Sequence, residues 1–145
     1  MQKINIEKNN ESYDFVTSLS VRIADLAGGL HVGNQTLISY LTEAQMQLMK
    51  TLGFPKLMVG SAMPINAHLE ISYLAEAEYG DELEIGLSVE EFMADGYILQ
   101  FNMLNIEKQR VICQSRWLMK FLDIQQHKPC NVPKEFIKAY KALGR

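Results

Sequence analysis

The chain has 145 residues, 48% of them hydrophobic and 21% charged, with a formal net charge of −3 and a pI near 5.6. This profile is typical of one globular domain, so we expect a single domain over residues 1–145. The acidic balance speaks against nucleic acid as the main partner, because phosphate binding needs a basic face. No apolar run approaches the ~20 residues of a membrane helix. The N-terminus "MQKINIEKNNESYD" lacks the apolar core of a signal peptide, so we expect no membrane partner and a cytoplasmic location.

The first predicted element is a strand between Tyr13 and Ile23. Alternate apolar residues would share its buried face, namely Tyr13, Phe15, Leu19, Val21 and Ile23. A glycine-containing loop, "ADLAGGLHVGN" (residues 24–34), follows it. The period then changes to three and four, which predicts an amphipathic helix of about 18 residues buried through Leu37, Leu41, Ala44, Leu48 and Leu52. Asn34 is the predicted N-cap and Gly53 the predicted C-cap.

Alternation returns after Pro64 and predicts four antiparallel strands. The first would place Ile65, Ala67, Leu69, Ile71 and Tyr73 on one face, opposite Asn66, His68 and Glu70. The second starts after a Gly80-Asp81 turn and would bury Leu83, Ile85, Leu87 and Val89. The last two form a long hairpin that turns near Glu107-Lys108. Pro133 is then expected to begin a short helix through Ala142.

This order predicts an α+β fold in which one long helix covers one face of an antiparallel sheet. The other face must be solvated or buried in a partner. Long strands with many apolar side chains favour the partner, so we expect at least a homodimer. Cys113 and Cys130 lack metal-ligand spacing and are expected to be reduced thiols, and we expect no metal site.

The segment "VRIADLAGGLHVGNQTLISYLTEAQ" (residues 21–45) resembles the signature of hotdog-fold acyl-CoA thioesterases of the 4-hydroxybenzoyl-CoA thioesterase type. That signature reads roughly V-R-x-x-D-x-D-x-x-G-H-V-N-N-x-x-Y-x-x-Y-x-E-E-A-R and aligns without a gap. The matching residues are Val21, Arg22, Asp25, His31, Val32, Asn34, Tyr40, Glu43 and Ala44. A variant signature, D-x-N-Y-G-x-H-x-G-N-D, adds Gly29 and Gly33. Similarity in "ISYLAEAEYGDELEI" and "FLDIQQHKPCNVPKEF" extends the resemblance over nearly the whole chain.

The resemblance implies a hotdog fold, with a long central helix wrapped by a five-stranded antiparallel sheet that dimerises through the sheet. A homodimer or homotetramer would place an acyl-CoA or acyl-carrier-protein thioester at the dimer interface, as substrate and without a further cofactor. The thioester carbonyl would point at the helix N-terminus near Asn34. Unpaired amides and the helix dipole there can stabilise a developing oxyanion.

The chain departs from the signature at the second aspartate, which is often the catalytic carboxylate. Ala27 occupies that position. Leu30 replaces a glycine of that signature and Gln45 its final arginine, and Gln35 replaces the last aspartate of the variant signature. The oxyanion-binding architecture is therefore expected to be present without the usual base.

Three residues are candidates for the catalytic group. Asp25 can act as a general base or hold the loop by hydrogen bonds to its amides. His31 can orient water and contact the thioester, or fasten the loop. Glu43 falls on a polar helix stripe with Thr36, Tyr40 and Gln47, which is either a solvated face or the site of a helix carboxylate facing the partner subunit.

Gly33, Asn34 and Tyr40 are the candidates for substrate binding. Gly33 allows the backbone to approach a ligand closely, although a simple turn accounts for it equally well. Three functions stay open. They are thioester hydrolysis, a non-catalytic hotdog protein that binds acyl-CoA or acts as a scaffold, and a hotdog dehydratase, whose histidine and glutamate spacing is not found.

Overall fold

A computed structural model describes residues 10–144. Residues 1–9 lie outside the described residues. The expectation that the N-terminus is not a signal peptide concerns mostly these residues. The elements in chain order are β1 (Phe15–Ser20), the 3₁₀ turn η1 (Ile23–Asp25), α1 (Asn34–Thr51), β2 (Ala62–Tyr73), β3 (Glu82–Phe92), β4 (Gly96–Asn105), β5 (Arg110–Asp123), β6 (Lys128–Pro129) and α2 (Lys134–Lys141). None of the helices within residues 10–144 is long and apolar enough to cross a membrane.

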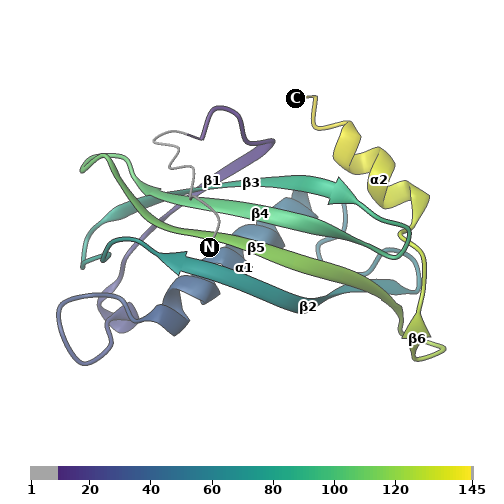
Figure 1. Cartoon of the computed structure of the whole chain (residues 1–145), viewed down its shortest axis with the longest axis horizontal. Coiled ribbons are helices and arrows are strands. Elements are labelled where there is room, and N and C mark those ends of the chain that lie inside the picture. The colour runs from purple at the N-terminus through teal and green to yellow at the C-terminus, as the bar shows by residue number, and fades with distance from the viewer. Residues whose placement is uncertain (1–9, 145) are drawn as a thin grey trace.

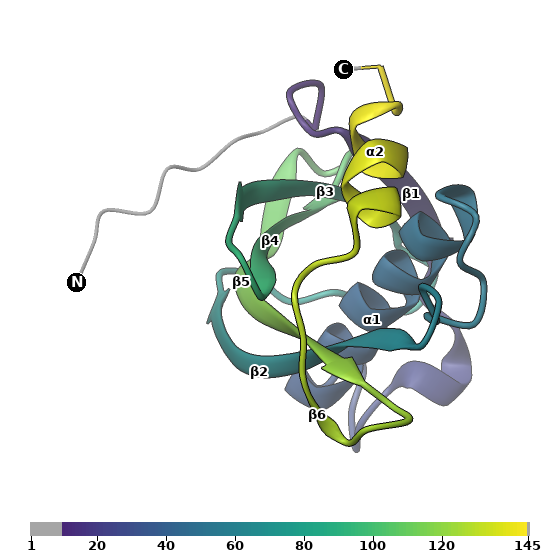
Figure 2. The same cartoon turned by 90° about the vertical axis from the view of Figure 1, so that its right-hand side faces the viewer.

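The sheet is antiparallel and wraps around α1, as Figures 1 and 2 show. Its strands follow the order β1-β3-β4-β5-β2, and the two-residue β6 pairs with β5. The five long strands of the expected hotdog fold are therefore confirmed, with β6 as an addition. The Gly80-Asp81 turn and the hairpin between β4 and β5 lie where the sequence predicts them.

α1 buries one face against the sheet, as its apolar period predicts. Its 18 residues match the predicted length, and its buried residues are Leu37, Tyr40, Leu41, Ala44, Gln45, Leu48 and Met49. The facing strands contribute fully buried side chains that include Ile85, Leu87, Leu99 and Phe121. One helix against one sheet face thus forms the core.

Four residues assigned to the inward faces of strands are exposed, namely Ile23, Ile65, Ala67 and Tyr73. Ile65 is exposed because the pairing of β2 with β5 shifts between Asn66 and His68, so Ala67 forms a bulge. A bulge inserts one extra residue and moves the inward position to the other parity. Ile23 is exposed because β1 ends at Ser20, and Ile23 begins the 3₁₀ turn instead of extending the strand.

The outer face of the sheet carries charged side chains. Arg116 pairs with Glu70 at 3.1 Å and with Glu90, and Lys120 lies 2.9 Å from Asp95. The outer face is thus partly solvated around Arg116 and Lys120 of β5 in the single chain.

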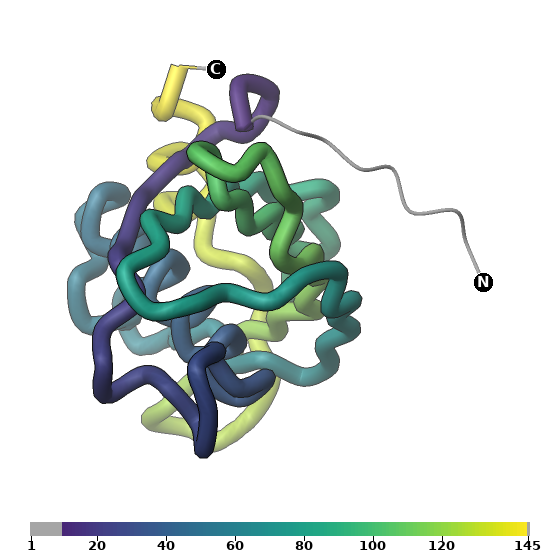
Figure 3. Tube along the Cα trace, turned by 90° about the vertical axis from the view of Figure 1, so that its left-hand side faces the viewer, coloured from purple at the N-terminus to yellow at the C-terminus, as the bar shows by residue number. Residues whose placement is uncertain are grey.

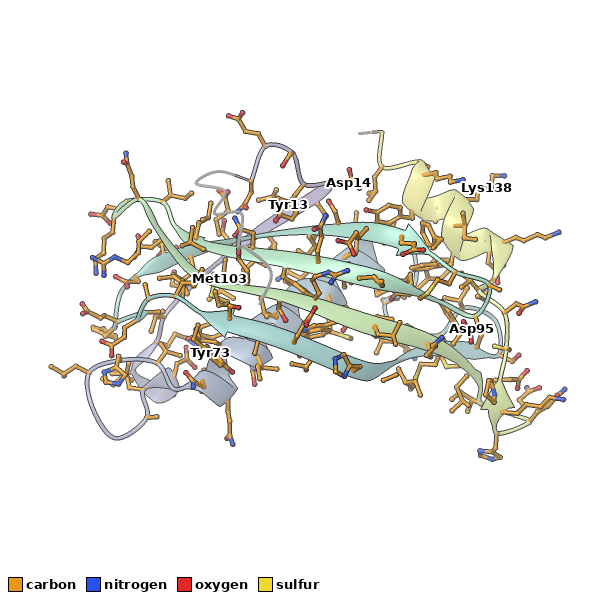
Figure 4. The ribbon with its side chains drawn as sticks, in the orientation of Figure 1. Tyr13, Asp14, Tyr73, Asp95, Met103 and Lys138 are labelled. Carbon is orange, nitrogen blue, oxygen red and sulfur yellow. The ribbon has the colours of Figure 1, made fainter. Side chains whose placement is uncertain are left out.

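The segment before β1 also packs on this outer face. The side chains of Asn10 and Tyr13 pack against Gly86, where a Cβ would lie 2.8 Å from each. Any side chain at position 86 would collide with Asn10 and Tyr13, so only glycine allows the segment before β1 to pass this close to β3. Figure 4 labels Tyr13 and Asp14, which lie just before β1.

α2 closes one end of the core. The Phe136 ring lies 5.1 Å from that of Tyr97, 5.4 Å from that of Phe121 and 6.3 Å from that of Phe54, measured between centroids. Phe54 follows shortly after α1, so α2 covers the C-terminal end of α1 (Figure 2). Pro133, the predicted first helical residue, is instead the N-cap of α2, so the helix begins at Lys134, one position later than predicted.

Candidate active site

Two connections meet at the end of the molecule where α1 begins. Residues 24–33 precede α1, and residues 74–81 join β2 to β3. The Val32 N–H donates to the Ala77 carbonyl at 2.8 Å, and His31 pairs with Glu78 as an isolated bridge. Figure 3 views the molecule from this end, with the earlier connection in dark blue and the later one in teal. Backbone hydrogen bonds therefore fix the two connections against each other.

The N-terminus of α1 lies in this region without a side-chain cap. Gly33, and not the predicted Asn34, is the N-cap, because Gly33 has extended backbone angles (φ −71°, ψ 158°) and Asn34 is already helical. Glycine offers no side chain to bind the first amides. The first turn of a helix leaves N–H groups without partners in the helix, and the dipole adds partial positive charge there. A carbonyl oxygen finds donors at this position.

Ala27 lies directly beside this helix start. A Cβ built on Gly33 would be 3.0 Å from the Ala27 Cβ, so the methyl group of Ala27 faces the N-cap backbone. The position that often holds the catalytic aspartate in the signature therefore faces the backbone at the start of α1. In this chain it is exposed and carries no functional group.

Asp25 fastens the loop to α1. Its Oδ2 accepts a hydrogen bond from the Arg22 N–H at 3.0 Å and another from the Tyr40 hydroxyl at 2.7 Å. The Arg22 backbone hydrogen bond, followed by that of Tyr40, holds the pKa of Asp25 below its ordinary value. Burial and the neighbouring Asp25 carboxylate raise the pKa of Tyr40. A carboxylate held in this way is a weak base.

His31 extends from the same loop toward the second connection. Its side chain is half exposed, and its Nδ1 lies 3.9 Å from Oε2 of Glu76. The imidazole therefore has a carboxylate on its Nδ1 side. Its backbone is held by the Ala27 N–H, which donates to the His31 carbonyl at 3.3 Å.

Glu43 lies on an exposed face of α1 and accepts a hydrogen bond from Gln47 at 3.1 Å. Gln47 in turn accepts one from Thr17 of β1 at 2.6 Å. Tyr40, predicted to share the polar stripe with Glu43, is buried and bonded to Asp25 instead. Within the single chain, these contacts connect Glu43 to β1 and do not bring it to Asp25 or His31.

An ionic cluster lies at the other end of residues 74–81. Lys108, at the tip of the β4–β5 hairpin, lies 3.0 Å from Asp81 and 3.4 Å from Glu78. Burial alone would raise the pKa of Asp81, but hydrogen bonds from the Glu78 N–H and Lys108 outweigh it and lower that pKa. Among residues 10–144, no group of three or more His, Cys, Asp and Glu side chains is arranged to hold a metal ion.

Sequence reasoning missed Glu76 and its neighbours in residues 74–81. The segment resembles the family, and its acidic residues are the available signal. Nothing in the sequence, however, indicates that this connection pairs with residues 24–33. The pairing depends on tertiary hydrogen bonds between positions more than 40 residues apart, such as Val32 and Ala77.

Comparisons with known proteins agree with this fold. Among solved structures, a 1,4-dihydroxy-2-naphthoyl-CoA thioesterase from Synechocystis is 18% identical with a TM-score of 0.81, over 90% of this chain and 98% of that one. A thioesterase from Thermus thermophilus complexed with coenzyme A and Zn is 20% identical with a TM-score of 0.81, over 93% and 98%. A Staphylococcus aureus protein in complex with CoA is 12% identical with a TM-score of 0.80, over 89% and 82%.

These identities establish the fold and no more. No curated protein sequence matches the chain significantly. A family model described as the thioesterase-like superfamily matches residues 21–140. That match includes the loop, α1, the four strands β2 to β5 and nearly all of α2. The chain therefore belongs to the thioesterase-like superfamily.

Proposed function

We propose that the protein hydrolyses an acyl-CoA thioester. The observation that carries this proposal is the uncapped start of α1 at Gly33, which lies between two connections that carry His31 and Glu76. Membership of the thioesterase-like superfamily supports the reaction class. Two structures of the same fold contain coenzyme A, which favours this carrier over an acyl-carrier protein.

The thioester carbonyl would lie at the first turn of α1. Amides of Gly33, Asn34 and the next residue would donate to its oxygen as negative charge develops there, the kind of stabilisation that is worth about 10²–10³-fold per donor. Water adds to the carbonyl carbon, the C–S bond breaks, and the products are a carboxylic acid and the free thiol. Tyr40 supports the loop that lines this position through its hydrogen bond to Asp25.

Of the three candidate bases, His31 has the most suitable surroundings. Asp25 already accepts two hydrogen bonds and has a lowered pKa, so we assign it the role of holding the loop. Glu43 contacts Gln47 on the exposed side of α1 and would need a partner subunit to approach the thioester. His31 is half exposed beside the helix start and can take a proton from water.

The site also favours a homodimer formed through the sheet. β2 ends the strand order and is 12 residues long, so one of its edges presents backbone groups to another strand. Sedimentation equilibrium at micromolar concentration should give a dimer or tetramer, and Ile65→Lys, on the exposed part of β2, should weaken it. A monomeric wild type would contradict an interfacial site.

A non-catalytic acyl-CoA-binding protein is the second candidate, and Ala27 is the observation that favours it. The test is a hydrolysis screen over aliphatic and aromatic acyl-CoA substrates, with the released thiol measured by a thiol reagent. Hydrolysis of at least one substrate above the uncatalysed rate, lost in His31→Ala, is expected. Binding of acyl-CoA without any turnover would instead select the second candidate.

A further inference from the structure

We infer that Glu76 positions His31 and stabilises its protonated form during hydrolysis, so that an imidazole–carboxylate pair replaces the aspartate missing at Ala27. This inference rests on the proposed thioester hydrolysis and adds a residue outside the resembling loop. The geometry behind it is the 3.9 Å separation between His31 Nδ1 and Glu76 Oε2, an ion-pair distance once the imidazole is protonated.

Backbone contacts hold this pair in place. His31 and Glu78 form a bridge between the two connections, and Val32 donates to Ala77, on either side of the pair. Glu76 directly precedes Ala77, so its position relative to His31 follows from hydrogen bonds between main chains. The contact therefore does not depend on two flexible side chains alone.

The other charged groups around His31 are already paired. Glu78 and Asp81 both contact Lys108, and Asp25 accepts hydrogen bonds from Arg22 and Tyr40. The ion-pair partner of Glu76 is His31. Of the four carboxylates on these two connections, Glu76 is thus the one within ion-pair distance of the imidazole.

The pair gives a balanced step. His31 Nε2 takes a proton from water as the water oxygen bonds to the carbonyl carbon, and the negative Glu76 stabilises the imidazolium. The intermediate then expels the thiolate as the C–S bond breaks, and the imidazolium returns its proton to the sulfur. His31 ends neutral, and one water has been consumed. Glu76 keeps its charge throughout and does not touch the substrate.

Steady-state kinetics of Glu76→Gln test the role. Loss of the carboxylate should lower kcat about 5- to 10-fold and leave KM within about twofold, because the affected state is the protonated imidazole. The acid limb of the pH profile should shift to lower pH, since His31 loses a negative neighbour that favours its charged form. Glu76→Asp should retain part of the wild-type kcat.

Glu78→Gln is the matched control, because it removes a carboxylate two residues away that pairs with Lys108. It should keep kcat and the acid limb at the wild-type values. A Glu76→Gln enzyme with unchanged kcat and acid limb, or an equal loss in Glu78→Gln, would overturn the positioning role while hydrolysis stands. A wild type that hydrolyses no thioester would overturn the proposed function and this role together.

NMR spectra of the imidazole signals provide a readout that needs no turnover. His31→Ala assigns the His31 signals among the three histidines. Glu76→Gln should change the chemical shifts of the His31 ring, because the carboxylate lies 3.9 Å from Nδ1, and Glu78→Gln should change them much less. Unchanged His31 ring signals in Glu76→Gln would show that the carboxylate does not contact the ring and would overturn the inference.

Discussion

The two ends of α1 differ sharply, although both belong to one short domain. At the C-terminal end, α2 covers the core with Phe136, whose ring contacts those of Tyr97, Phe121 and Phe54. At the N-terminal end, about 27 Å away along 18 residues of helix, the start of α1 has no side-chain cap. Leu30 is 81% exposed there and Ile23 72%.

Exposed apolar side chains are concentrated at this open end. Tyr73 and Leu74 at the end of β2, Tyr79 before β3 and Ile106 at the tip of the β4–β5 hairpin add to Leu30 and Ile23. Figure 4 shows Tyr73 on the side where α1 begins, whereas Lys138 extends from α2 at the other end. Large exposed apolar patches often mark binding surfaces. We therefore propose that the closed end serves stability and that the open end binds the substrate.

The largest expected effect concerns stability at the closed end. Phe136→Ala removes a fully buried ring that four aromatic rings surround, and it should lower the free energy of unfolding by about 3–5 kcal/mol. Urea denaturation measures this loss. The kcat of the folded enzyme should stay within about twofold of wild type. A large loss of kcat in fully folded protein would show that the closed end takes part in the reaction.

The next effect concerns activity at the open end. Gly33→Val should place a branched side chain against Ala27 and over the first amides of α1, and we expect kcat to fall about 10²-fold or more. The variant should fold, because φ at Gly33 is −71° and suits any residue. Ala142→Val, at the exposed C-cap of α2, is the control that should keep its activity. Equal activity of a folded Gly33→Val would place the site elsewhere.

A smaller effect is expected for the link between the loop and α1. Asp25→Ala removes two hydrogen bonds, leaves the buried Tyr40 hydroxyl without this acceptor and should cost about 2 kcal/mol of stability at pH 7. Because the pKa of Asp25 in the folded state is lowered from 3.8, this stabilisation is complete above pH 3.8 and is lost as the pH falls through the folded-state value. Unfolding at pH 7 measures the stability that Asp25 contributes, and unfolding at pH 3 measures how much of this contribution is lost in acid. A difference between wild type and variant that is the same at both pH values would contradict the charged hydrogen bonds.

The smallest effect is a gain. Ala27→Asp restores a carboxylate beside Gly33, and we expect kcat to rise about tenfold, or about 1.4 kcal/mol of transition-state stabilisation. Ala27→Asn, which has the same shape without the charge, is the control. No gain over this control would mean that the site lacks more than its usual base.

Periodicity predicted most of the fold, because burial of one face leaves a regular pattern. The buried stripe of α1 and the inward residues of β3 follow it closely. The pattern failed at Ala67, where a bulge reverses the parity of β2, and at Ile23, where a 3₁₀ turn replaces the strand. Neither feature has a signature in a single sequence.

The candidate site was predictable only in its local part. The loop and the helix start are contiguous in the chain, so Ala27, His31 and Gly33 could be found from the motif. The hydrogen bond between Asp25 and Tyr40 joins residues on different elements, and the contact between His31 and Glu76 joins two connections. Such contacts depend on how elements pack, and periodicity carries no information about them.

The most direct test of the account is to locate a bound thioester analogue. An acyl-CoA analogue with a methylene group between sulfur and carbonyl binds without being hydrolysed, and amide NMR shifts report where it binds. We expect the largest shift changes from Gly28 to Thr36 and around Glu76. Large changes confined to α2, with residues 28–36 unchanged, would contradict the assignment of binding to the open end.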